Sequence, residues 1–212
     1  MADENTDVSE KTELESQRER LYESLDMPDL FGKYDMKEVE VRDSGLERYI
    51  NLLPILLPHS GGKHANKRFK KEEISIIERL INNMMRTEDF TGKKLKAYNA
   101  VKDAMDIVNE RTEKNPVQVL VDAIENSAPR EETTQITYGG ISVPKAVDVS
   151  PSRRISLALS KITQGAVKAS YKNPKKISTC LAEELIKASR RDRDSFAVSK
   201  KEETERMAAS AR

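Results

Sequence analysis

The sequence is short of the residues that several common classes of protein require. Its 212 residues include one cysteine, no tryptophan and only 5% aromatic residues. A single cysteine, Cys180, excludes an intramolecular disulfide framework and favours a reducing compartment. The longest apolar run, residues 52–58, is too short and too broken by proline to span a bilayer, and the chain opens without a basic-then-apolar signal pattern. We therefore expect a cytoplasmic protein with no membrane partner.

The sequence also lacks a set of residues that indicates catalysis or metal binding. His59 and His64 are the only histidines, and with the distant Cys180 they make a poor zinc site. The Gly92–Lys93 pair is not a phosphate-binding P-loop, because Lys94 stands where a magnesium-binding Ser or Thr is needed. No pair of carboxylates stands out for acid–base chemistry. We expect no catalytic, cofactor-binding or metal-binding residues, and no enzyme.

Charge is plentiful but unevenly distributed. The net charge is only +1. Residues 1–50 hold 15 acidic and 7 basic residues, whereas the rest of the chain holds 21 acidic and 30 basic ones. This division predicts an acidic, partly disordered extension over residues 1–40 and a helical domain over residues 41–212 that meets a polyanion.

Apolar residues at helical spacing predict a mainly α fold. Six helices are expected near residues 72–86, 92–113, 116–126, 151–168, 174–189 and 197–209. The third is apolar on most of its faces, which predicts a buried central helix. A weak amphipathic helix over residues 12–26 and a short helix capped by Ser44 are also expected. Residues 52–58 are expected to form an extended apolar plug against the helical domain.

The clearest β pattern lies at residues 133–149. Apolar residues alternate with polar ones on both sides of Gly139–Gly140, which predicts a two-stranded antiparallel hairpin. A lone two-stranded ribbon is only marginally stable, so it must lean on helices or on a partner. Both a structural hairpin that caps the core and an arm that contacts a ligand remain open, and the second is favoured.

Two kinds of cationic feature point to a polyanionic ligand. Five of the nine residues 63–71 are Lys or Arg, with Phe69 among them and two glycines before them. A solvated loop is the plain alternative to nucleic-acid contact there. Cation pairs are also expected in the first turns of three helices, at residues 93–94, 153–154 and 175–176, although cations there oppose the helix dipole. Phosphate bound at the helix N-termini would account for them, and chance in a Lys- and Arg-rich chain would be the alternative.

Three helix starts share an N-cap followed by proline, namely Asn115–Pro116, Ser150–Pro151 and Asn173–Pro174. Asn and Ser cap helices well, and proline is favoured at the first helical position. We therefore expect helices to begin at these three prolines.

The sequence resembles ribosomal protein seven of the small subunit over about residues 40–212. The resemblance is carried by residues 91–98 (TGKKLKAY), 115–120 (NPVQVL), 128–131 (APRE), 138–140 (YGG), 146–151 (AVDVSP), 153–154 (RR), 181–186 (LAEELI) and 200–203 (KKEE). Residues 56–64 (LLPHSGGKH) and the acidic extension are similar to archaeal rather than bacterial members.

The resemblance implies six helices with a two-stranded antiparallel β-ribbon between the third and fourth, plus an extended N-terminal region. It implies primary binding to the 3′ major domain of small-subunit rRNA, nucleation of head assembly, and a position near the decoding centre, the exit-site tRNA and mRNA. Neighbouring small-subunit proteins are the other expected partners, and no homo-oligomer is expected. A helical DNA-binding regulator is the alternative function.

Residues expected to contact rRNA lie in the basic loop, at the cationic helix starts and in the ribbon with its base. They are Lys63, His64, Lys67, Arg68, Lys70, Lys71, Lys93, Lys94, Lys96, Arg130, Tyr138, Lys145, Arg153, Arg154, Lys175 and Lys176.

Overall fold

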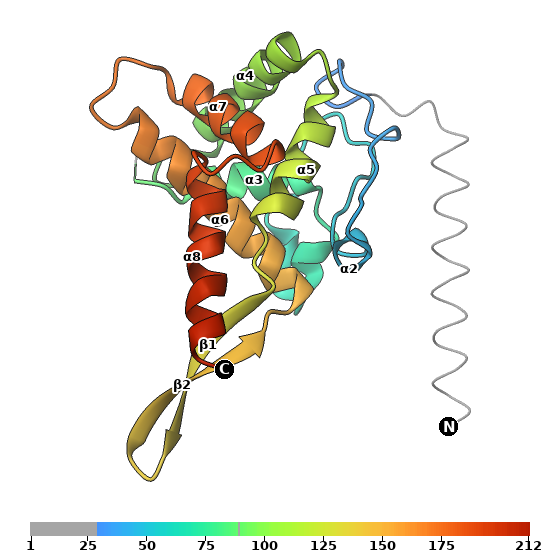
Figure 1. The fold of residues 1–212 in the computed structure, drawn as a ribbon. Helices are drawn as coiled ribbons and strands as arrows, with labels where there is room; N and C mark the ends of the chain where they lie inside the picture. Colours follow the sequence, from blue (N-terminus) through green and yellow to red (C-terminus); the bar gives the residue numbers. More distant parts are fainter. Residues whose placement is uncertain (1–28, 89) are drawn as a thin grey trace, which may run out of the picture.

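The computed structural model describes residues 29–88 and 90–212 as a helical body from which a β-ribbon projects (Figure 1). The helices are α2 (Ser44–Glu47), α3 (Ile76–Met85), α4 (Lys94–Thr112), α5 (Pro116–Ser127), α6 (Pro151–Ser170), α7 (Ile177–Ser189) and α8 (Phe196–Ser210). Two short 3₁₀ turns, Lys63–Asn66 and Lys70–Glu72, precede α3. The predicted fold class is confirmed, since the ribbon separates the third and fourth of the six longer helices. The helix predicted over residues 12–26 lies outside the described residues.

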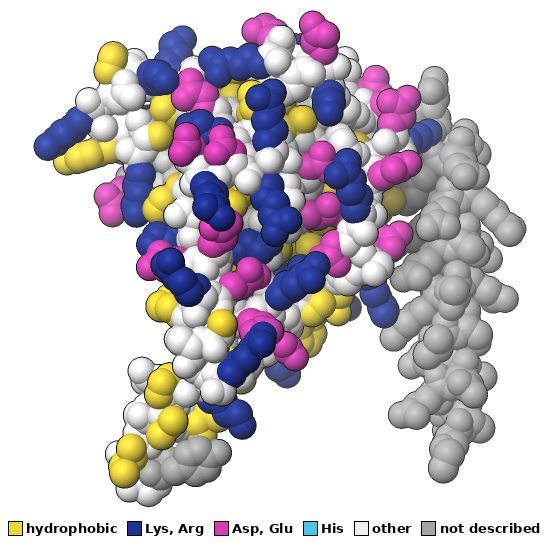
Figure 2. Space-filling model, in the orientation of Figure 1, with side chains coloured by type: hydrophobic (Ala, Val, Ile, Leu, Met, Phe, Trp, Pro, Cys, Tyr) yellow, Lys and Arg dark blue, Asp and Glu magenta, His cyan; other side chains and the backbone are white. Residues whose placement is uncertain are grey.

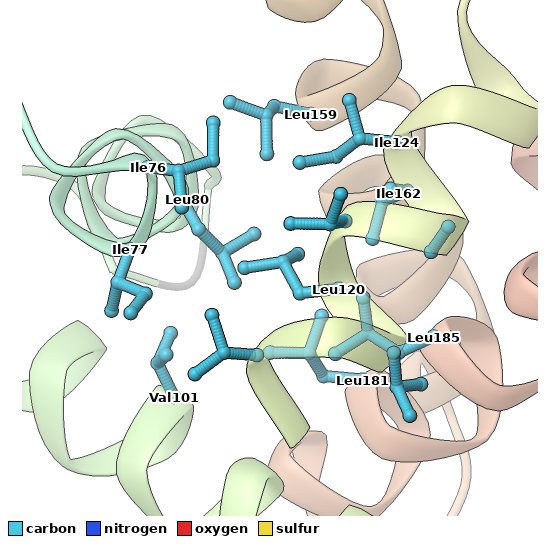
Figure 3. Packing of buried hydrophobic residues seen from close by; sticks show 14 of the residues in the cluster. Ile76, Ile77, Leu80, Val101, Leu120, Ile124, Leu159, Ile162, Leu181 and Leu185 are labelled. Atoms are coloured by element: carbon cyan, nitrogen blue, oxygen red, sulfur yellow. The ribbon is translucent and has the colours of Figure 1, made fainter. Parts of the chain in front are cut away.

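Helix α5 lies at the centre of the hydrophobic core, as its apolar sequence predicts. Leu120 and Ile124 are fully buried and lie among side chains from α3, α6 and α7 (Figure 3). Burying a Leu or Ile side chain contributes about 1.5–3 kcal/mol, so this helix holds its neighbours in fixed positions. Leu30 and Met36 belong to the same core, which attaches residues 29–40 to the helical body.

Several expected helix boundaries are confirmed and others are wrong. Asn115 caps α5 by accepting a hydrogen bond of 3.0 Å from the Val117 N–H, and Ser150 stands at the N-cap of α6 without a side-chain bond. The expected start at Pro174 is wrong, because the Asn173 side chain accepts from the Lys175 N–H in a turn and α7 begins only at Ile177. The first long helix begins at Ile76 rather than residue 72.

The short helix α2 also begins differently from the prediction. Asp43, not Ser44, is its N-cap, and its side chain accepts a hydrogen bond from the Gly45 N–H. Asp is as good a cap as Ser, so the sequence offers two adjacent candidates. The Asp43 carboxylate is also held by Arg154, a contact that only the folded chain supplies.

The expected apolar plug at residues 52–58 is only partly buried. Leu52 packs against the core, but Leu56 and Leu57 are 51% and 58% exposed. The Leu56 carbonyl accepts a hydrogen bond from the Phe31 N–H, so this segment is attached partly through its backbone. The prediction of a buried plug is therefore wrong for Leu56 and Leu57.

The ribbon consists of β1 (Glu131–Tyr138) and β2 (Ile141–Asp148), paired antiparallel. Gly139 and Gly140 form its turn with φ of 56° and 85°, values that a two-residue hairpin turn requires and that glycine adopts without strain. Its base is attached to α8, because the Ala146 N–H donates to the Ala211 carbonyl and Arg212 pairs with Glu131. Its outer half projects beyond α8 (Figure 1), and Ile141 and Val143 there are 69% and 47% exposed.

Replacing residues 137–145 by a short Gly-Ser linker should leave the helical body folded. The removed side chains are mostly exposed, so little buried apolar area is removed. We expect unchanged helical circular dichroism and a free energy of unfolding within about 1 kcal/mol of the original, together with weaker RNA binding. Loss of cooperative unfolding would show instead that the ribbon supports the fold.

Candidate nucleic-acid interface

A groove with a volume of about 980 Å³ runs between α3 and α6. Each helix faces it with a polar stripe at helical spacing. Arg79 and Asn83 on α3 and Arg86 at its C-cap are spaced three or four residues apart, as are Ser156 and Ser160 on α6. Residues three or four apart share a helix face, so the helical repeat aligns these side chains along the groove. Leu157 and Val167 add apolar surface to its lining.

The groove is strongly cationic. Its described lining includes the five Lys or Arg residues Lys71, Arg79, Arg86, Arg153 and Lys168, together with His64 and one carboxylate, Glu88. Low-dielectric walls concentrate the field of charges that line a cleft. The face that carries α7 and α8 differs, because Lys and Arg there lie among Asp and Glu (Figure 2). The groove is thus built to attract an extended anion.

A buried carboxylate, Glu78, fixes one wall of the groove. Its side chain is only 3% exposed and lies 2.7 Å from Lys94 Nζ, at the start of α4. Its Oε1 also accepts hydrogen bonds of 2.9 Å from the N–H and the hydroxyl of Ser60. Burial raises the pKa of Glu78, but hydrogen bonds from Lys94 and Ser60 outweigh burial and leave the pKa below its ordinary value. Glu78 therefore joins α3, α4 and the segment that leads into the basic loop.

The structure brings three of the sixteen predicted contact residues into the groove. They are His64, Lys71 and Arg153. Lys63, Lys67 and Arg68 are exposed on the neighbouring loop, where the Arg68 guanidinium lies 5.1 Å from the centre of the Phe69 ring. Lys70 follows in the same loop and is half-buried.

The remaining predicted residues do not line the groove. Lys96 lies on α4, Lys145 on the ribbon, and Arg130 at the ribbon base, where its N–H donates to Glu205. Tyr138 lies in β1, and its side chain is outside the part of the chain that the structure describes. Rigid helices hold these positions apart, so a ligand that touched all of them would have to be large.

Several of the cations at the helix starts already form ion pairs within the chain, which the sequence does not show. Ion pairs hold four of these side chains, namely Lys94 to Glu78, Arg153 to Glu132, Arg154 to Asp43 and Lys175 to Glu183. Carboxylates within the chain therefore account for the positions of Lys94 and Arg154, whose ion pairs are partly or largely buried, and contact of these two residues with rRNA stays a prediction. Lys175 and Lys176 also precede α7 rather than lying in its first turn. Lys93 and Lys176 are exposed and form no ion pair with any described residue.

The sequence interpretation missed most of the groove. Its further polar or aromatic lining residues are Arg79, Asn82, Asn83, Arg86, Thr87, Glu88, Ser156, Ser160, Thr163, Gln164, Lys168 and Tyr171. A usable signal exists in α6, where positions 152, 156, 160, 164 and 168 are all polar at intervals of four. Such a stripe marks an exposed helix face, but the sequence does not show that it faces α3.

Two other features are absent from the described helices and side chains. None of these helices is long and apolar enough to cross a bilayer. No group of three or more His, Cys, Asp or Glu side chains in residues 29–88 and 90–212 is arranged to hold a metal ion. The groove is the feature of the described residues that we consider as the nucleic-acid interface.

A helical body with a cationic groove and a projecting ribbon is the architecture of a protein that can bind a large polyanion through its surface. The family model described as "Ribosomal protein S7p/S5e" matches residues 46–212, and the chain belongs to this family of small-subunit ribosomal proteins. The family is one of ribosomal structural proteins, not of enzymes.

Relatives cover nearly the whole chain. Small ribosomal subunit protein uS7 of Archaeoglobus fulgidus is 54% identical over 183 residues, which are 86% of this chain and 94% of that protein. The uS7 proteins of Methanothermobacter thermautotrophicus and Picrophilus torridus are 54% and 55% identical over 86% of this chain and 98% of each relative. The resemblance to archaeal members of the family, first seen in short motifs, is confirmed.

Proposed function

We propose that this chain is a primary rRNA-binding protein of the small ribosomal subunit. It binds the 3′ major domain of the rRNA and nucleates assembly of the subunit head in the cytoplasm. The observation that carries the proposal is the groove between α3 and α6, where five Lys or Arg side chains face one carboxylate among the described residues. Family membership supports RNA as the polyanion, since the protein must meet rRNA in the subunit.

The distribution of cations supports a folded RNA as the ligand. Besides the groove and the adjoining basic loop, exposed cations lie at the ribbon base (Arg130), on the ribbon (Lys145) and on α4 (Lys96), so a ligand that meets all of them must be large. Folded RNA offers phosphates in several directions and is recognised largely by shape. A DNA reader would instead place exposed residues of one recognition helix in the major groove.

The ribbon supplies a second contact in the proposal. Its outer half projects from the body (Figure 1) and exposes apolar side chains beside Lys145. In the subunit this arm reaches toward the exit-site tRNA and mRNA near the decoding centre. Neighbouring small-subunit proteins cover other parts of the surface.

Competition between two nucleic acids tests the proposal. The full chain is bound to a labelled 3′ major domain fragment, and unlabelled fragment or duplex DNA of equal charge is added. The folded fragment should compete at much lower concentration, because it matches the separated contacts. Equal competition by duplex DNA would favour the DNA-binding alternative and contradict the proposal.

A further inference from the structure

Two cations meet at one hydroxyl inside the groove. Lys71 Nζ lies 3.5 Å from Ser156 Oγ, and Arg79 Nη2 lies 3.3 Å from the same atom. Ser156 donates its own proton to the Ser152 carbonyl, so its oxygen faces both cations as an acceptor. Like charges brought this close repel each other, and a bound anion would relieve the repulsion.

Of the two cations, Arg79 is the more deeply buried and has the greater need of an anionic partner. Its residue is only 6% exposed, and its remaining described contact is a hydrogen bond to the Tyr49 carbonyl. It forms no ion pair with the carboxylates that the structure describes. Buried charges are normally paired; burial lowers the pKa of Arg79, and the Glu72 carboxylate, which lies outside ion-pair distance, offsets this only in part. The guanidinium fork suits a phosphate, which it can bind through two N–H groups.

The end of the groove near the C-terminus of α6 presents an aromatic ring and amide groups. Tyr171 is the C-cap of α6 and is 72% exposed, with Lys172 Nζ 5.3 Å from the centre of its ring and Lys168 three residues before it. Ser156 and Tyr171 are fifteen residues apart, about 22 Å along the helix. Asn82, Asn83 and Gln164 lie on the groove between these ends, with amide groups that both donate and accept hydrogen bonds.

We propose that the groove holds an unpaired stretch of the rRNA, with one backbone phosphate at Lys71, Arg79 and Ser156 and one base stacked on Tyr171. This inference rests on the proposed function and names the form of RNA that enters the groove. Tyr171 can stack only on an exposed base, whereas the bases inside a duplex are already stacked on one another. Stacking on aromatic rings and phosphate contacts along a groove are the usual means of binding single strands.

The phosphate site is tested by filling it with a carboxylate. Ser156→Asp places an anion between Lys71 and Arg79, and Ser156→Asn is the uncharged control of the same size. We expect Ser156→Asp to raise Tm and to weaken binding of the 3′ major domain fragment about tenfold or more, and Ser156→Asn, which loses the hydroxyl but adds no charge, to weaken binding clearly less than Ser156→Asp. Inorganic phosphate, compared with chloride at equal ionic strength, should raise Tm of the original chain but not of Ser156→Asp.

The base contact is tested separately with Tyr171→Leu and Tyr171→Phe. Loss of the ring should weaken binding of an unstructured oligoribonucleotide about tenfold, whereas Phe should retain it. The same oligonucleotide annealed to its complement should compete poorly. Equal binding of Ser156→Asp and the original chain, or equal competition by the duplex, would overturn the inference while leaving rRNA binding intact. Failure of the original chain to bind the 3′ major domain fragment would instead contradict the proposed function.

Discussion

Changing Arg86 and Lys168 together to Gln is expected to weaken binding of the 3′ major domain fragment by about a hundredfold. Both side chains are exposed on the groove, on opposite walls. A hydrogen bond to a charged group contributes about 1.5–3 kcal/mol, and about 1.4 kcal/mol is tenfold in affinity. The salt dependence should also flatten, by about 0.7–0.9 in slope for each phosphate that the variant no longer binds.

The matched control removes two cations outside the groove. Lys114 and Lys187 are exposed, and changing both to Gln alters the net charge equally. Binding should fall only slightly if the groove is the interface. Lys168 also lies over the Phe196 ring at 4.2 Å, a contact of about 0.5–1 kcal/mol, so the stability of both variants is measured by urea unfolding. Equal losses of affinity in the two variants would show that only overall charge matters.

The second large effect concerns stability and centres on Glu78. Changing Glu78 to Gln should lower the free energy of unfolding at neutral pH by about 3 kcal/mol, the lower end for breaking a buried ion pair. Lys94 is left without its carboxylate but keeps partial exposure. Changing Lys94 to Met in the same chain should recover part of the loss, because the unpaired charge is then absent. Urea unfolding measures the free energy of unfolding of the original chain, of Glu78→Gln and of the double variant.

The same residue predicts a dependence on pH. Because the folded-state pKa of Glu78 is lowered, its contribution to stability is present above its unfolded pKa, about 4.3. It is lost as pH falls from there through the folded-state pKa. The original chain should therefore lose more stability than Glu78→Gln over this range. Glu73→Gln, an exposed change just before α3, should keep the original profile, and identical profiles for Glu78→Gln and the original chain would contradict the assignment.

The helices and ribbon could be predicted because their signals are local. Ile77, Leu80, Ile81 and Met84 recur at helical spacing, and all are fully buried in α3. Gly139–Gly140 fixes the turn of the ribbon. Asn173–Pro174 misled the prediction, because an N-cap followed by proline also suits a turn, and the neighbouring residues decide between the two.

The groove could not be predicted because its walls are far apart in the sequence. Arg79 and Ser156 lie 77 residues apart, and only the packing of α3 against α6 brings them together. The same holds for Arg154 and Asp43, which are 111 residues apart. Counting cations along the sequence therefore does not distinguish Arg154, whose side chain pairs with Asp43 inside the fold, from Lys93, whose side chain is exposed. Both are equal candidates for contact with rRNA on that count.

Photo-crosslinking tests whether the rRNA lies in the groove between α3 and α6. The full chain is bound to a 3′ major domain fragment containing 4-thiouridine, irradiated, and digested for mass spectrometry. We expect crosslinks in peptides covering residues 79–86 and 156–171, on the two walls of the groove, and in the basic loop at residues 63–71. Crosslinks confined to residues 103–125, on α4 and α5 away from the groove, would contradict it.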